Sequence, residues 1–307
     1  MQLAPIALFV YNRPEHTLQV LEALAKNDLA DLSILYVFAD GPKTGADENI
    51  LERIKDTRKI VKSRKWCKEV YLIERDSNLG LGRSITKGVT EVIDKYGKVI
   101  VLEDDIVTGK GFLKYMNDGL KMYKDNDEII SIHAYNYPIN TAGLPETFFL
   151  KGADCWGWAT WKRGWELYND DAQALYLGIK NKRLTYDFDF RGSYPYTGML
   201  EDQINGKVDS WAIKWYASAF LHNKYTLYPR QSLVMNIGID GSGTHCFGEN
   251  NLSNSLIDYC NIVSMPVKQS SLAVKRIAKF HRGDARVSFA GRFKSYISAV
   301  LKKALQI

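Results

Sequence analysis

The first 135 residues alternate between short apolar segments rich in β-branched side chains and longer amphipathic segments. The strand-like segments are 5–12, 32–40, 69–75 and 98–103, and the helix-like segments are 13–27, 47–63 and 84–96. Strands that alternate with helices of this length form right-handed βαβ units, whose sheet is mainly parallel and covered on both faces. The pattern therefore predicts an α/β fold with a Rossmann-like, mainly parallel sheet flanked by helices.

Polar residues follow each of the predicted strands. They are Asn12 and Arg13, Asp40, the loop 78–84 and the triplet Glu103, Asp104 and Asp105. Ligands of such sheets bind beyond the carboxyl ends of the strands, so these groups are expected along one edge. A solvated turn is the alternative interpretation of the triplet.

Two common nucleotide-binding motifs are missing. The stretch "NLGLGRSI" follows a strand and opens a helix, but Ile85 replaces the third glycine of the dinucleotide fingerprint. The phosphate-binding GxxxxGK[ST] loop is absent from the sequence. The glycines of the loop are instead expected to let it pass close to a ligand or to the sheet edge.

The composition is that of an ordinary globular chain. It has 307 residues and is 46% hydrophobic, enough to bury a large core. No apolar run of about 18 residues and no signal peptide is present, so a cytoplasmic protein is expected. The four cysteines form no CxxC pair, so neither a disulfide framework nor a cysteine zinc site is expected.

An acidic strand end in a nucleotide-binding sheet suits a hard divalent cation that bridges the phosphates of a sugar nucleotide. The chain here resembles the GT-A-fold glycosyltransferases, and within them the N-acetylglucosaminyltransferase I type, whose metal motif is also Glu-Asp-Asp at a strand end. The resemblance runs through roughly residues 4 to 250 and includes "YNRPEHTLQVLEAL", "FADG", "VLEDDIVTGKGFLKYMNDGL" and "SIHAYN". It implies Asp105 as the direct ligand of Mn²⁺ or Mg²⁺, with Glu103 and Asp104 facing the donor sugar and ribose.

Further roles are implied by the same resemblance. Arg13 falls where an arginine meets the diphosphate, Asp40 falls where an aspartate receives the base, and Arg83 is placed with the donor-binding residues. "DCWGWATWKRGWELY" resembles the tryptophan- and glycine-rich region that shapes the acceptor side, although tryptophans at such spacing also suit a core.

The catalytic base and a phosphate-closing loop are also implied. "VDSW" resembles the acid-acid-tryptophan motif, which makes Asp209 the catalytic base, and "GSGTHCFG" resembles the mobile loop, with Thr244 and His245 toward the diphosphate. Val208 and Ser210 depart from the family's aromatic residue and second acid, which leaves the donor sugar open. Asp209 also suits the N-cap of the following helix, a role compatible with that of a base.

The sequence thus predicts a metal-dependent, inverting glycosyltransferase. It would move a sugar from a nucleotide diphosphate sugar, UDP-linked by resemblance, to a hydroxyl of a growing or lipid-linked glycan in bacterial surface polysaccharide or lipopolysaccharide synthesis. A sugar-1-phosphate nucleotidyltransferase and a catalytically silent sugar-nucleotide- or glycan-binding protein are the alternatives. Residues 1–135 are expected to form the nucleotide-sugar-binding half, 136–262 the acceptor-side and catalytic half, and 263–307 a basic helical tail.

The tail accounts for the net positive charge of the chain. From Val267 to the end there are ten basic residues against Asp284 alone, a local net charge of +9 in a chain of net charge +6. This argues for an anionic partner of the tail and against a nucleic-acid-binding body. The apolar stripe Phe293, Tyr296, Ile297, Val300, Leu301 and Ala304 suits a helix on the inner face of the cytoplasmic membrane. Docking on the protein's own core or on a second subunit is the other interpretation.

Overall fold

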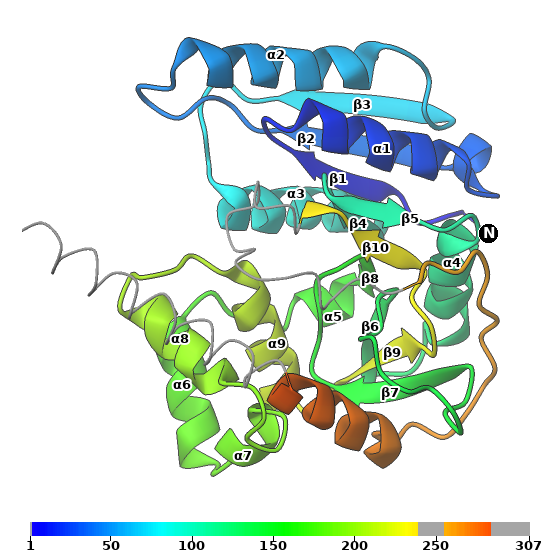
Figure 1. The fold of residues 1–307 in the computed structure, drawn as a ribbon, viewed down its shortest axis with the longest axis vertical. Coiled ribbons are helices and arrows are strands. Elements are labelled where there is room, and N and C mark those ends of the chain that lie inside the picture. Colours follow the sequence, from blue (N-terminus) through cyan, green and yellow to red (C-terminus); the bar gives the residue numbers. More distant parts are fainter. Residues whose placement is uncertain (1, 239–254, 284–307) are drawn as a thin grey trace, which may run out of the picture.

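The computed structural model describes residues 2–238 and 255–283. An eight-stranded sheet runs through the molecule in the order β3-β2-β1-β4-β8-β6-β9-β7, as Figure 1 shows. Its strands are β1 Ile6–Val10, β2 Ile34–Ala39, β3 Glu69–Glu74, β4 Lys98–Glu103, β6 Ile129–His133, β7 Thr147–Lys151, β8 Trp158–Trp161 and β9 Tyr225–Pro229. Only β7 and β8 run against the other six, so the sheet is mixed and mainly parallel.

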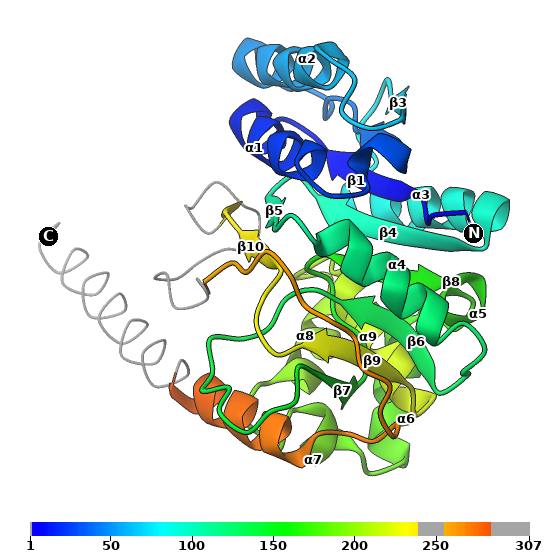
Figure 2. The ribbon, with the colours of Figure 1, turned by 90° about the vertical axis from the view of Figure 1, so that its right-hand side faces the viewer.

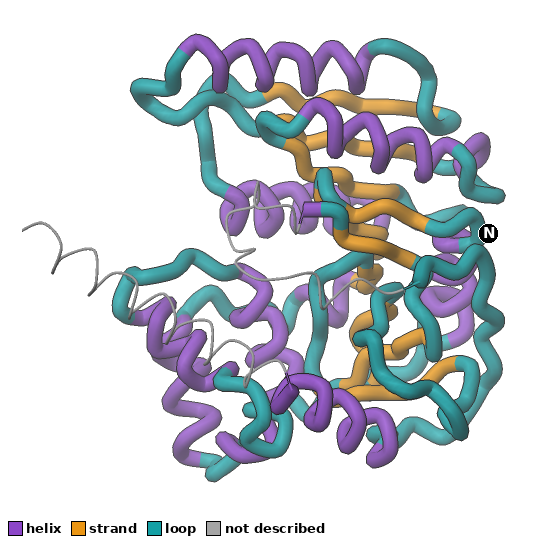
Figure 3. The backbone as a smooth tube through the Cα atoms, viewed as in Figure 1, coloured by secondary structure: helices purple, strands orange, loops and turns teal. Residues whose placement is uncertain are grey.

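Helices cover both faces of the sheet. The α-helices are α1 Pro14–Ala25, α2 Glu48–Lys62, α3 Leu81–Tyr96, α4 Phe112–Met122, α5 Lys162–Trp165, α6 Ala172–Asn181, α7 Thr185–Phe188, α8 Tyr196–Ile204 and α9 Trp211–Leu221, and η1 Ala30–Leu32 is a 3₁₀ turn. A further helix spans 271–283. Figure 2 shows α1 and α2 on the opposite side of the sheet from α3, and Figure 3 shows the strands enclosed between helical layers. The expected α/β fold is confirmed.

Alternating side chains of the central strands build two cores. Ile6, Leu8 and Val10 of β1 face α1, α2 and α4, while Ala7 and Phe9 of the same strand face α3, α5 and α9. All five residues are buried, as expected for a parallel strand covered on both faces. The helices and strands predicted in the first 103 residues are confirmed to within a few residues at their ends.

The tryptophan-rich segment belongs mainly to the core. Trp158 of β8 is fully buried and packs against Trp165, Trp211 and Trp215 with ring centroids 5.5 to 5.7 Å apart. Trp156, by contrast, is half-buried at the carboxyl edge of the sheet. The segment therefore contributes both to packing and to the edge where ligands are expected.

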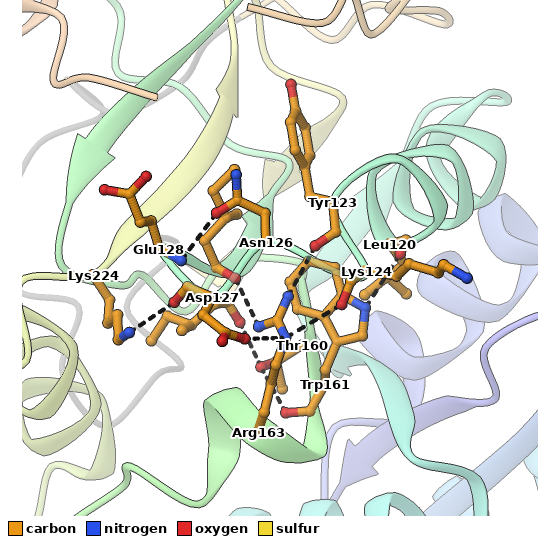
Figure 4. Close-up of polar contacts among 12 residues, drawn as sticks. Leu120, Tyr123, Lys124, Asn126, Asp127, Glu128, Thr160, Trp161, Arg163 and Lys224 are labelled. Atoms are coloured by element: carbon orange, nitrogen blue, oxygen red, sulfur yellow. Dashed lines mark hydrogen bonds and ion pairs between the residues drawn. The ribbon is translucent and has the colours of Figure 1, made fainter. Parts of the chain in front are cut away.

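Arg163 connects α5 with the end of α4 and the start of β6 (Figure 4). Its Nη2 donates to the carbonyl oxygen of Tyr123 at 2.9 Å and its Nη1 to that of Ile129 at 2.8 Å, so it joins the end of α4 to the start of β6. The guanidinium also lies 4.2 Å from the centre of the Trp161 ring. These contacts hold α5 against the start of β6 and the end of α4.

A short ribbon extends the acidic triplet. β5 Ile106–Thr108 follows Asp105 directly and pairs antiparallel with β10 Val234–Asn236. The amide of Ile237 donates to the carbonyl oxygen of Asp105 at 2.9 Å. The ribbon therefore holds a segment from late in the sequence against the end of β4.

The helix 271–283 docks on the body of the protein, at the bottom of Figure 1. Its buried residues Ala273, Val274 and Ile277 pack in a cluster with Leu144, Phe148, Leu150, Phe190 and Tyr228. This part of the predicted tail is thus packed on the chain's own core. The stripe from Phe293 to Ala304 lies outside the described residues. Within the described residues, none of the helices combines the length and the apolar character needed to cross a bilayer.

Candidate functional site

The carboxyl edge of the sheet gathers the predicted polar groups. The neighbouring parallel strands β3, β2, β1 and β4 all end at this edge, followed by the loop 75–80, Asp40, Arg13 and the acidic triplet. These four groups are spread over almost 100 residues of sequence, and the parallel topology aligns them. Their expected position along one edge is confirmed.

Arg13 is in direct contact with the triplet. Its Nη2 lies 2.8 Å from Asp105 Oδ2 and 3.4 Å from Asp104 Oδ1, and its Nη1 lies 3.1 Å from Asp105 Oδ2. The three side chains are only 12%, 16% and 13% exposed for Arg13, Asp105 and Asp104. The triplet is therefore not a solvated turn but a largely buried set of charges with an arginine as counter-ion.

The triplet carries more carboxylates than Arg13 can neutralise. Burial raises the pKa of Glu103 well above its ordinary value, and the charges of Asp105 and Asp104 raise it further. Burial also raises the pKa of Asp104 to about 7, against the opposing effect of Arg13. Such crowding of like charges favours a site that receives positive charge when it is occupied.

Gly238 closes over the ion pair. A Cβ at this position would overlap Asp105 Oδ2 and would lie 2.9 Å from Arg13 Nη2. The backbone here approaches the site more closely than any side chain would allow. Gly238 is also the last residue described before 239–254, so Thr244 and His245 lie outside the described residues.

Asp40 organises the loop after β3. Its carboxylate accepts hydrogen bonds from the amides of Gly41, Leu79 and Gly80 at 3.0 to 3.1 Å. The side chain is buried, so the structure assigns these oxygens to the loop that leads into α3. Recognition of a nucleotide base by Asp40 stays a prediction.

Asp209 and Arg83 lie at the start of α3. A Cβ at Gly82 would be 3.3 Å from Asp209 Oδ1, which places the exposed Asp209 carboxylate against the first turn of this helix. Arg83 is exposed on the same turn. The N-cap of α9 is Ser210, whose side chain accepts from the amide of Ile213, so the capping role predicted for Asp209 is wrong. Its role as a base stays a prediction.

A second polar cluster lies beside the triplet. Its residues fall mainly in segments that the resemblance covers, but no individual role was predicted for them. Asp154 precedes β8, which is antiparallel and therefore begins at the carboxyl edge of the sheet. Its carboxylate accepts from the amide of Cys155 at 2.8 Å and from the hydroxyls of Tyr228 and Tyr137 at 3.3 and 3.4 Å. Burial raises the pKa of the Cys155 thiol, and the nearby charges of Asp154 and Glu103 raise it further. The feature of the sequence that could have indicated this cluster is the position of Asp154, between an apolar strand and a tryptophan-rich segment.

Two histidines border Asp154. Nε2 of His133 accepts from the amide of Trp156 at 3.2 Å and lies 3.9 Å from Asp154 Oδ1. Burial lowers the pKa of His133, and it lowers the pKa of His281 to about 4. Both imidazoles are therefore neutral at pH 7, so neither brings a formal positive charge to Asp154.

A metal would have to rely on few protein ligands. Within 2–238 and 255–283, no group of three or more histidine, cysteine, aspartate or glutamate side chains is arranged to hold a metal ion. Mg²⁺ is commonly held by one or two carboxylates together with substrate phosphates and water. The adjacent carboxylates of Asp104 and Asp105 fit this kind of coordination, and a metal ion at the site stays a prediction.

Comparisons with known proteins give no family. No family model matches the chain, and no curated protein matches it. Many solved structures show limited similarity, and two of them serve as examples. A cytidylyltransferase from Leptospira borgpetersenii serovar Hardjo-bovis (strain JB197) is 14% identical with a TM-score of 0.32, over 53% of this chain and 61% of that chain. A UDP-glucose pyrophosphorylase complexed with UDP-glucose is 13% identical with a TM-score of 0.32, over 54% of this chain and 79% of that chain. The chain thus covers less than two thirds of the cytidylyltransferase, and similarities this low carry no argument about activity.

Proposed function

We propose that this protein is a metal-dependent, inverting glycosyltransferase that moves a sugar from a nucleotide diphosphate sugar to a hydroxyl of a glycan. The contact of Arg13 with Asp104 and Asp105 carries the proposal. The resemblance in sequence assigns these three residues to the diphosphate, the ribose and the metal. Arg13 lies more than 90 residues before the two aspartates in the chain. The three side chains meet at the edge where sheets of this kind bind ligands.

The residues of the chain would divide the reaction among them. Asp105 would hold the cation, which when bound would supply positive charge to the departing diphosphate, and Asp104 would face the ribose. Arg13 would add a second, fixed positive charge at the same phosphates. Asp209 would take the proton of the acceptor hydroxyl as its oxygen attacks the anomeric carbon from the side opposite the leaving group, which inverts the configuration.

The test is the metal dependence of nucleotide binding. Calorimetric titration of a panel of nucleoside diphosphates, with and without Mn²⁺, should find at least one that binds more tightly with the metal. Asp105→Ala should remove this difference, while Asp56→Ala, a change of an exposed carboxylate on α2, should keep it. Equal affinity with and without Mn²⁺ in the unchanged protein would contradict the proposal.

The alternatives predict different products. A glycosyltransferase slowly hydrolyses its sugar nucleotide to nucleoside diphosphate and free sugar when no acceptor is present. A sugar-1-phosphate nucleotidyltransferase instead releases pyrophosphate from a nucleoside triphosphate and a sugar 1-phosphate. A binding protein does neither, so product analysis by chromatography separates the three functions.

A further inference from the structure

The cluster around Asp154 contains a buried polar atom with no partner. His281, on the helix 271–283, is only 4% exposed, and its Nε2 makes no hydrogen bond to any residue that the structure describes. Its ring lies 4.8 Å from that of Tyr194 and 5.1 Å from that of Tyr137, centre to centre. A buried imidazole nitrogen without a partner is costly, so its retention beside a polar cluster indicates a ligand.

The Asp154 carboxylate also has capacity for a ligand. Its side chain is 23% exposed. Among the described residues, the one basic side chain within 4 Å of the carboxylate is that of His133, which is neutral, so no positive charge pairs with Asp154. The hydroxyls of Tyr137 and Tyr228 reach it only at 3.4 and 3.3 Å, longer than a typical bond between oxygens. An ionised carboxylate accepts hydrogen bonds and donates none, so it suits a ligand with hydroxyl donors.

Aromatic rings connect the two groups. Successive ring centres lie 4.6 to 5.4 Å apart along the series Trp156, Tyr135, Tyr137, His281, Tyr194 and Tyr196. Trp156 and Tyr137 are half-buried and Tyr194 is 37% exposed, so part of the series faces the outside. Aromatic walls with a few fixed polar groups are typical of small-molecule sites.

We propose that Asp154 and His281 bind hydroxyl groups of the acceptor sugar, so that the helix 271–283 supplies a specificity-determining residue to the site. The inference rests on the proposed glycosyl transfer for the identity of the ligand. Asp154 belongs to the segment that the resemblance assigns to the acceptor side, whereas His281 lies beyond the resemblance, which ends near residue 250. Val101 of β4 lies opposite Trp158 of the antiparallel β8, so Glu103 and the segment that precedes Trp158 lie at the same end of these two strands. This places the subsite next to the donor edge.

The experiment uses saturation-transfer NMR with the full chain, UDP and the diamagnetic Mg²⁺. The probes are the methyl pyranosides of glucose, galactose, mannose and N-acetylglucosamine. At least one should contact the unchanged protein. His281→Phe keeps an aromatic ring but removes the nitrogens, and Asp154→Asn keeps the shape but removes the charge. Each should weaken glycoside binding at least about tenfold, the effect of losing one good hydrogen bond.

Two further variants separate recognition from packing. His281→Gln keeps a polar group in place and should restore part of the affinity lost in His281→Phe, while His222→Phe, a change of an exposed histidine after α9, should have no effect. UDP binding should be unchanged in all variants. If the unchanged protein does not bind UDP, this result counts against the proposed function. The glycoside signals would still report on the subsite at Asp154 and His281.

Three results would overturn the inference. One is that none of the four glycosides contacts the unchanged protein. Another is that binding persists in His281→Phe with the circular dichroism of the native fold. If His281→Phe does not fold, undiminished binding in both His281→Gln and Asp154→Asn would be the third.

Discussion

At the scale of single residues, the close approach of Gly238 to the site can be tested by adding one methyl group at this position. Gly238→Ala would place a Cβ against Asp105 and Arg13, so the ion pair has to shift. We expect a loss of about 1–3 kcal/mol in the free energy of unfolding, the usual cost of overpacking, and weaker nucleotide binding. Gly198→Ala is the control, because its Cβ would meet only Pro195 Cβ at an ordinary 3.7 Å within α8. Urea denaturation and calorimetry measure both effects, and equal behaviour of the two variants would contradict the close approach at Gly238.

His281 gives a prediction on pH. Burial lowers the pKa of His281 to about 4, against the opposing charge of Asp154, so between this value and its ordinary 6.5 the unfolded chain binds a proton that the folded protein does not. The stabilising contribution of the neutral imidazole is complete above pH 6.5 and is lost as the pH falls toward 4. Relative to His281→Phe, the unchanged protein should therefore lose roughly 2–3 kcal/mol between pH 7 and 4.5. Urea denaturation at several pH values measures this, and parallel pH profiles would show that the histidine is not buried.

At the scale of elements, the start of α9 separates a structural from a chemical role. Ser210 caps the helix, so Ser210→Ala should cost about 1 kcal/mol in stability and leave the catalytic group in place. Asp209 is exposed and does not cap, so Asp209→Asn should leave stability unchanged and reduce sugar transfer by about 100-fold or more, as expected for a lost general base. Thermal denaturation and a transfer assay test the pair. Transfer at close to the normal rate in Asp209→Asn would move the base elsewhere.

At the scale of the whole molecule, the chain beyond residue 270 consists of the docked helix 271–283 and of residues 284–307, which lie outside the described residues. A chain that ends after residue 269 lacks the helix 271–283 and uncovers Leu144, Phe148 and Leu150. We expect it to lose several kcal/mol, on the order of 5, because Val274 and Ile277 and their partners lose buried apolar area. A chain that ends after residue 283 keeps these contacts and should melt at nearly the normal temperature. Scanning calorimetry distinguishes the two, and equal melting temperatures would show that the helix contributes little.

The remaining basic segment gives a separate prediction. Residues 284–307 include Arg286, Arg292, Lys294, Lys302 and Lys303, and each basic residue near an anionic bilayer adds on the order of 1 kcal/mol of attraction. The full chain should therefore sediment with phosphatidylserine-containing vesicles at low salt and be released at high salt. The chain that ends after residue 283 should not sediment but should still bind nucleotide. If the shortened chain still sediments with the vesicles, the surface that binds them lies within residues 1–283 and not in residues 284–307.

The amino-acid sequence determined the first half of the sheet because its pattern is local. The strands from Ile6 to Glu103 and the helices between them follow from the spacing of apolar side chains. The parallel order then aligns Arg13, Asp40 and the triplet at one edge. The period of the apolar residues indicates which side of a helix or strand is buried. This information predicts the fold when elements that are neighbours in the sequence are also neighbours in space.

Only the tertiary structure decided how this edge is completed. The antiparallel β8 lies between β4 and β6, out of sequence order, and so brings Asp154 beside Glu103. The β5–β10 ribbon brings Gly238 onto the Arg13–Asp105 pair, and the last described helix brings His281 to Tyr137. These contacts join residues more than 40 apart in the chain. Such contacts depend on which distant surfaces pack together, a choice set by the whole core and not by the spacing of residues within any one segment.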